Sequence, residues 1–186
     1  MPSSAPALLT PVMSMVMSMH PRSVLDVGCG LGKWGALCRE YLDWWGSSDG
    51  LGTRRTRIDA VEIHEPYIGE LHRVVYDRIV IGDAVEYLGS EASAPGYDLI
   101  LCMDMIEHLD AACGRRFLTV AMERSNAVLL STPISPMAQG AVFGNEHERH
   151  VSAWKPDDFD IFGHVSSWST GGLYVVLLRH PEGNAA

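Results

Sequence analysis

The sequence lacks the features of several protein classes. Its 186 residues contain no apolar run as long as a membrane span, no internal repeat and no low-complexity tract. Basic residues are few, 14 Lys and Arg against 23 Asp and Glu, which gives a formal net charge of −9. Because this charge repels a phosphate backbone, it disfavours a large nucleic-acid interface and favours a small or cationic ligand.

The four cysteines are not paired at close spacing, and they lie at Cys29, Cys38, Cys102 and Cys113. This pattern favours free thiols over disulfides or a zinc cluster, and it predicts a reducing, cytoplasmic location. Residues 1–21 have no basic start and are interrupted by prolines, which argues against an export signal.

At 186 residues with 47% hydrophobic content, the chain suits one domain and is too short for two of ordinary size. Four apolar residues recur at helical spacing near the start: Val12, Met15, Val16 and Met19. They predict an N-terminal helical segment over residues 1–20, which would pack on a sheet or cover a binding-site mouth. Residues 21–186 are predicted to form the single main domain.

Strand-like and helical segments alternate through most of the chain. Five segments are predicted as strands: 24–27, 57–62, 78–81, 97–103 and 127–131. Helices are predicted over 34–45, after Pro66 and around 115–122, with a polar connection over 46–56. Two final strands, 164–169 and 173–179, are joined too tightly for a crossover helix. The predicted fold is α/β: a Rossmann-like, doubly wound, mostly parallel seven-stranded sheet with a C-terminal antiparallel hairpin strand.

The stretch VLDVGCGLG, residues 24–32, joins an apolar strand to Asp26 and to Gly28, Gly30 and Gly32. The dinucleotide-binding fingerprint spaces its glycines as G-x-G-x-x-G, but here the third glycine comes one position early and Lys33 follows it. An oxidoreductase that uses a nicotinamide nucleotide therefore ranks low. With its acid before the glycines, the stretch resembles motif I of the class I S-adenosylmethionine (SAM) methyltransferases. That resemblance implies a Rossmann-like fold and SAM as cofactor.

Acidic residues end four successive strands: Asp26, Glu62, Asp83 and Asp104. Because carboxyl ends of neighbouring parallel strands meet at one edge of the sheet, these acids are expected to converge near the glycines. An acidic cradle also suits the positive charges of a sulfonium and an ammonium group. The alternative is that each acid is the N-cap of the following helix.

The resemblance assigns roles to individual residues of the cofactor site. It implies that Glu62 accepts hydrogen bonds from the ribose hydroxyls and Asp83 from the adenine amino group. Ile63 and Ala84 would contact the adenine, while Asp26 would orient the loop or reach the methionine ammonium through water. The complete predicted cofactor-binding set is Asp26, Gly28, Gly30, Gly32, Glu62, Ile63, Asp83, Ala84 and Asp104.

The segment DMIEHL, residues 104–109, resembles the post-strand motif of small-molecule methyltransferases of the ubiquinone-biosynthesis type. It is also similar to the small-RNA 2′-O-methyltransferases, in which an acid precedes Glu-His-Leu and a Thr-Pro loop and a later His-x-x-x-Trp follow. The second resemblance implies a divalent metal, Mg²⁺, Mn²⁺, Fe²⁺ or Zn²⁺, held by Asp104, Glu107, His108 and His150. Asp104 stands where that family has the longer glutamate.

Other roles for the same residues stay open. Without a metal, His108, His150 or Glu107 would act as catalytic base or orient the acceptor, because histidine titrates near neutrality. A purely structural role would have Glu107 and His108 cap a helix that begins near Asp110, and His150 lie in a solvated loop.

The sequence therefore predicts a SAM-dependent methyltransferase that acts on a small molecule, with O-methylation favoured. One alternative is a catalytically silent SAM-binding subunit with the same fold, and another is metal-assisted 2′-O-methylation of RNA ends. Neither nucleic acid nor membrane is an expected partner of the leading candidate. The oligomeric state is open, a homodimer included.

Overall fold

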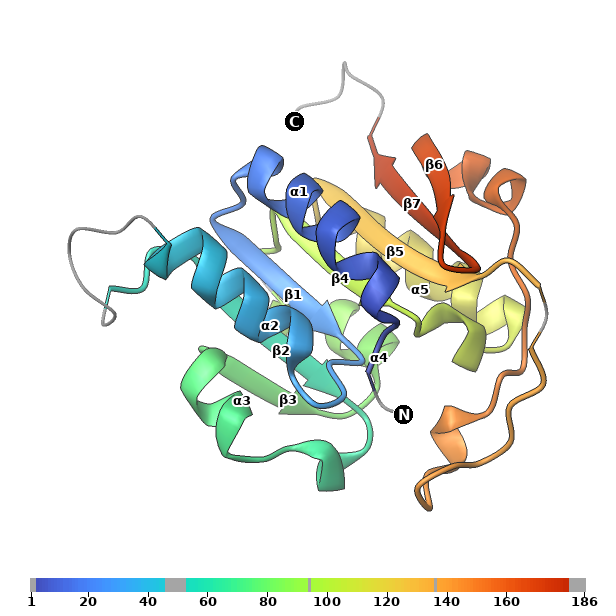
Figure 1. The fold of residues 1–186 in the computed structure, drawn as a ribbon, viewed down its shortest axis with the longest axis horizontal. Helices are drawn as coiled ribbons and strands as arrows, with labels where there is room; N and C mark the ends of the chain where they lie inside the picture. The colour runs from blue at the N-terminus through green and yellow to red at the C-terminus, as the bar shows by residue number, and fades with distance from the viewer. Residues whose placement is uncertain (1–2, 46–52, 94, 136, 181–186) are drawn as a thin grey trace.

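A computed structural model describes residues 3–45, 53–93, 95–135 and 137–180 (Figure 1). Its centre is a seven-stranded sheet in the order β3-β2-β1-β4-β5-β7-β6. The strands are β1 (Ser23–Val27), β2 (Arg57–Glu62), β3 (Arg78–Ile81), β4 (Leu99–Met103), β5 (Ala127–Pro133), β6 (His164–Thr170) and β7 (Leu173–Arg179).

Pairing within the sheet confirms the predicted fold class. Strands β1 to β5 pair in parallel, whereas β7 lies antiparallel between β5 and β6. The predicted bounds of β2 and β3 are correct. Strand β4 begins two residues later than predicted, because Tyr97 makes only an isolated bridge to Ser125, and β5 continues to Pro133 along β7.

Helices cover both faces of the sheet (Figure 1). They are α1 (Leu9–Met19), α2 (Lys33–Cys38), α3 (Glu70–Val75), α4 (Ala84–Leu88) and α5 (Ala111–Glu123). Because successive strand residues point to opposite faces, Val24 joins the core beneath α1, α2 and α3, and Leu25 joins the core beneath α4 and α5. Both cores are continuous apolar layers, as a parallel sheet buried on two sides requires.

The N-terminal segment is part of this packing. Helix α1 buries Val12, Met13 and Val16 against the first core, with Met15 and Met19 at its margin. The residues before α1 lie at the carboxyl ends of the strands, where they line a cavity. The segment therefore does both things predicted for it: it packs on the sheet and reaches a binding-site mouth.

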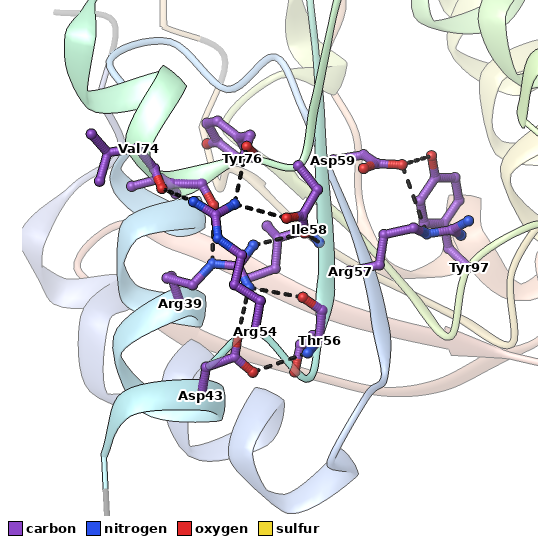
Figure 2. Close-up of polar contacts among 12 residues, drawn as sticks. Arg39, Asp43, Arg54, Thr56, Arg57, Ile58, Asp59, Val74, Tyr76 and Tyr97 are labelled. Atoms are coloured by element: carbon purple, nitrogen blue, oxygen red, sulfur yellow. Dashed lines mark hydrogen bonds and ion pairs between the residues drawn. The ribbon is translucent and has the colours of Figure 1, made fainter. Parts of the chain in front are cut away.

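The predicted helix over 34–45 forms in two parts, α2 and a π-helical turn, Arg39–Trp44. Buried Arg39 holds this turn against its neighbours (Figure 2). Its guanidinium forms an ion pair with the Asp43 carboxylate and a second ion pair, at 2.8 Å, with Oδ2 of Asp77. It also donates a hydrogen bond to the carbonyl of Thr56 at 2.8 Å. Residues 46–52 of the predicted connection lie outside the described residues.

All four cysteines are unpaired, as predicted. Within the described part of the chain, no helix combines the length and apolar character needed to cross a membrane.

Candidate functional site

A cavity of about 720 Å³ opens where the parallel strands end. Its walls come from the glycine loop after β1, the segments that follow β2, β3 and β4, residues 3–5, and the chain between β5 and residue 150. The turn between β6 and β7 closes one side. Ligands of doubly wound sheets bind at this edge.

The glycine loop forms one wall through positions that tolerate no side chain. Gly28 has a φ of 67° and donates from its N–H to the carbonyl of Val61 at 2.9 Å. A Cβ at Gly28 would lie 2.7 Å from Cγ of Met105, so any larger residue there must push Met105 aside. Gly30, with a φ of 53°, also lines the cavity. The backbone itself is thus presented to a ligand.

Asp26 lies behind this wall rather than in it. Its Oδ2 accepts from the Tyr76 hydroxyl at 2.6 Å and from the Gly35 N–H at 3.1 Å, which ties β1 to α2. Burial raises the pKa of Asp26 to about 6, and the two hydrogen bonds offset part of that rise. Of the predicted cofactor-binding residues, Asp26 and Gly32 do not line the cavity. The contacts of Asp26 are with Gly35 of α2 and with Tyr76, outside the glycine loop.

Glu62, at the end of β2, is 4% exposed and connects two walls of the cavity. Its Oε2 accepts from the Gly30 N–H at 2.9 Å, and its Oε1 accepts from the His64 N–H at 2.9 Å. Each carboxylate oxygen has a further lone pair, so Glu62 can also accept from a ligand. Ile63, next in the chain, is half-exposed on the cavity wall.

Asp83 serves as the N-cap of α4, as the alternative interpretation held. Its Oδ1 accepts from the N–H groups of Val85 at 2.8 Å and Glu86 at 3.0 Å. Both cap bonds use Oδ1, and Asp83 and Ala84 also line the cavity. The capping and ligand-binding roles are therefore compatible.

Asp104, after β4, has a left-handed backbone with a φ of 52°, an uncommon conformation for a residue with a side chain. The Ser131 hydroxyl donates to its Oδ1, and the Ala5 N–H donates to its Oδ2 at 3.4 Å. Burial raises the pKa of Asp104. The carboxylate is fixed between β5 and the N-terminal segment.

The N-terminal segment crosses the cavity mouth at Ser4. The Ser4 carbonyl accepts from Nζ of Lys33, and its hydroxyl accepts from Nε1 of Trp34 at 2.9 Å. Burial lowers the pKa of Lys33, and the charge of Asp104 opposes this effect. The first residues of α2 are thereby linked to residues 3–5.

Three side chains gather on the opposite wall: Glu107, His108 and His150. The two imidazole rings meet edge to face with centroids 4.8 Å apart. Nδ1 of His108 is 3.1 Å from the carbonyl of Arg149, and Nδ1 of His150 is 2.9 Å from that of Met137. Since a carbonyl only accepts, each of these Nδ1 atoms acts as the donor, and the backbone of Asp104 is a second hydrogen-bond partner of His108.

Glu107 completes this cluster from a buried position, 2% exposed. Its Oε2 has no hydrogen-bond partner in the described chain, and burial raises its pKa to about 8. Burial also lowers the pKa of His108, which favours the neutral ring. Glu107 and His108 do not cap α5, because Asp110 does so through its own Oδ1.

The donor set fits a divalent metal. Glu107, His108 and His150 each offer one ligand atom, and these atoms lie within 4.8 Å of one another. Metal-bound histidines commonly donate their second N–H to a backbone carbonyl, as both do here. The predicted fourth ligand, Asp104, is not in this group, since Ser131 and the N-terminal segment engage its carboxylate.

The chain that carries His150 is anchored across the cavity. The Tyr67 hydroxyl donates to Oε1 of Glu148 at 2.8 Å and accepts from Nδ2 of Asn145 at 3.2 Å. Gln139 bonds the same segment twice: its Nε2 donates to the Glu148 carbonyl, and its backbone carbonyl accepts from the His150 N–H. The wall with the histidines is therefore tied to the segment that follows Glu62.

Solved structures of similar architecture identify the fold. The methyltransferase domain of bacterial CtHen1 aligns with a TM-score of 0.61 at 17% identity, over 93% of this chain and 97% of that one. A SAM-dependent methyltransferase from Archaeoglobus fulgidus gives 0.60 at 15%, over 92% and 93%. The N-terminal domain of EvdMO1 with S-adenosylhomocysteine (SAH) bound gives 0.61 at 16%, over 95% and 82%. The chain has the class I methyltransferase fold. No family model and no curated protein matches the sequence.

Within the methyltransferase fold, most of the predicted site residues converge on one cavity. Those that line it are Gly28, Gly30, Glu62, Ile63, Asp83, Ala84, Asp104, Glu107, His108 and His150. Trp154, which follows His150 in the His-x-x-x-Trp pattern, stacks on Phe159 in the second core with ring centroids 5.6 Å apart.

Sequence reasoning missed the contacts between distant segments. The hydrogen bond between Lys33 and Ser4 joins residues 29 positions apart in the sequence. The hydrogen bond between Tyr67 and Glu148 joins residues 81 positions apart. No local pattern marks either pair. In the sequence, Lys33 stands out only by its place after the third glycine.

Proposed function

We propose that this chain is a SAM-dependent methyltransferase that transfers a methyl group to a small-molecule acceptor, by O-methylation. The observation that carries the proposal is the pairing of two walls. On one, buried Glu62 is bonded to the glycine loop; on the other, the His108 and His150 rings meet edge to face beside Glu107. The cavity between them has room for a nucleoside and a small acceptor.

The cofactor wall fits SAM in shape and chemistry. Glu62 has lone pairs available for a ribose diol, and Ile63 provides apolar surface beside it. Four of the carboxyl residues that line the cavity provide a favourable setting for a cationic ligand: Glu62, Asp83, Asp104 and Glu148. Bound SAM would supply an electrophilic methyl group on its sulfonium.

The protein's own contribution would be alignment and removal of a proton. In-line displacement of a good leaving group depends mostly on the position of the nucleophile. Burial lowers the pKa of His108, which favours the neutral imidazole, the form that can accept a proton from an acceptor hydroxyl. His150 offers a second imidazole. These bases favour a hydroxyl as nucleophile.

The net charge of −9 supports a small acceptor over RNA. The test is transfer of labelled methyl from SAM to a panel of hydroxylated, amino and thiol compounds, with short RNA included. We expect labelling of a hydroxylated small molecule. Labelling of RNA alone would contradict the proposed acceptor. Binding of SAM without methyl transfer to any compound would contradict the proposed catalysis.

A second candidate is metal-assisted methyl transfer. It is favoured by Glu107, whose buried Oε2 lacks a hydrogen-bond partner in the described chain and lies with the two histidines. Glu107, His108 and His150 would hold the metal, which would lower the pKa of an acceptor hydroxyl. Isothermal titration with Mn²⁺, on the wild type and on Glu107→Gln, tests the site without an acceptor. Binding lost in the variant supports this candidate, and no binding to the wild type excludes it for Mn²⁺.

A further inference from the structure

One peptide unit of the N-terminal segment bridges two charged side chains of the cavity. The carbonyl of Ser4 accepts from Nζ of Lys33, while the N–H of the same peptide unit, on Ala5, donates to Oδ2 of Asp104 at 3.4 Å. The bridge thus presents an acceptor to the cation and a donor to the anion. Both side chains line the cavity.

An α-amino acid carries the same two functions in a comparable space, with a full charge on each. Its carboxylate would accept from Lys33, and its ammonium would donate to Asp104. Charge-assisted hydrogen bonds are about twice as strong as neutral ones, so a zwitterion would satisfy this pair better than a peptide unit does.

Lys33 brings a positive charge to a cavity that is also lined by acidic residues. Among the described residues that line it, Lys33 is the sole Lys or Arg, whereas five are acidic. The acids favour a sulfonium and an ammonium group but repel a carboxylate. A ligand with a carboxylate therefore has one strong cationic partner there.

We propose that Lys33 and Asp104 form a subsite for the amino-acid end of the cofactor, and that the Ser4–Ala5 peptide unit occupies it until the cofactor displaces that unit. The inference rests on the proposed function and adds to it a specificity determinant and a competing segment of the chain. Burial lowers the pKa of Lys33 and raises that of Asp104, so burial disfavours the charged form of each side chain.

Two ligands separate the amino-acid end from the nucleoside. SAH carries both parts, whereas 5′-methylthioadenosine lacks the amino-acid end. In isothermal titration we expect Lys33→Gln to weaken SAH binding about tenfold or more and to change methylthioadenosine binding less than about twofold. Lys155→Gln is the matched control, because Lys155 is the chain's other lysine and is exposed outside the cavity. It should alter neither affinity.

The competing peptide unit is tested with Ala5→Pro. Ala5 already has a φ of −60°, which proline adopts, so the substitution removes the N–H donor to Asp104 at this φ. We expect SAH to bind about two- to tenfold more tightly and methylthioadenosine to be unaffected. Weaker SAH binding in Ala5→Pro would overturn the competition.

The outcomes distinguish this inference from the proposed function. If the wild type binds SAH but Lys33→Gln weakens both ligands equally, or neither, the subsite is wrong and the proposed function stands. If the wild type binds neither ligand, both are wrong. Circular dichroism of each variant checks that it is folded.

Discussion

The Glu62 carboxylate accepts a hydrogen bond from the Gly30 N–H at 2.9 Å, which joins the end of β2 to the glycine loop after β1. The two residues are 32 positions apart, and the parallel pairing of β1 with β2 brings them together. One carboxylate therefore both shapes the loop and faces the cavity.

Replacement of Glu62 should damage cofactor binding. Glu62→Gln keeps the size of the side chain but turns one acceptor oxygen into a donor, which conflicts with the N–H of either Gly30 or His64. We expect SAH affinity to fall about tenfold or more, measured by isothermal titration. Glu65→Gln, on an exposed residue of the next turn, is the control. Equal affinities for the two variants would remove Glu62 from the cofactor site.

His150 should affect turnover more than cofactor binding. His150→Ala removes one of the two imidazoles that line the cavity, and loss of a general base typically costs about 10²- to 10⁴-fold in rate. We expect a decrease of that size in methyl transfer to the acceptor found in the panel, with SAH affinity nearly unchanged. Turnover at the wild-type rate would exclude both base and metal-ligand roles for His150.

The Tyr67 hydroxyl should restrain the segment that carries His150. Tyr67→Phe leaves the Glu148 carboxylate, which is 9% exposed, without this donor. We expect amide hydrogens of residues 145–150 to exchange about tenfold faster, as loss of about 1.4 kcal/mol of local stability implies. Tyr174→Phe, on β7 outside the cavity lining, is the control. Unchanged exchange in Tyr67→Phe would show that other contacts hold the segment.

The sequence was sufficient for the fold and for much of the site. Buried strands, glycine turns and a tight hairpin are local patterns, and strand ends converge by the geometry of a parallel sheet, so Glu62 and Asp104 could be placed beforehand. Contacts between loops could not, because no periodicity fixes the path of residues 3–5 or 137–150. Asp104 was predicted as a metal ligand from the family resemblance alone, and its bond to Ser131 follows from the pairing of β4 with β5.

Asp26 predicts a pH dependence of stability. Its folded pKa of about 6 exceeds the usual 3.8, so the folded chain holds this proton more tightly than the unfolded chain does. The resulting stabilisation is complete below about pH 4 and is lost as the pH rises through about 6. Between about pH 4 and pH 8, the wild type should lose about 2 kcal/mol of unfolding free energy relative to Asp26→Asn. Urea denaturation of both proteins across this pH range measures the two free energies of unfolding. A difference between them that does not change with pH would contradict the raised pKa of Asp26.

Isothermal titration of the full chain with SAH tests the central claim most directly. The glycine loop, buried Glu62 and the cavity between them predict saturable binding of one SAH per chain, lost in Glu62→Gln and not competed by NAD. Absence of heat beyond dilution at millimolar SAH would contradict the account.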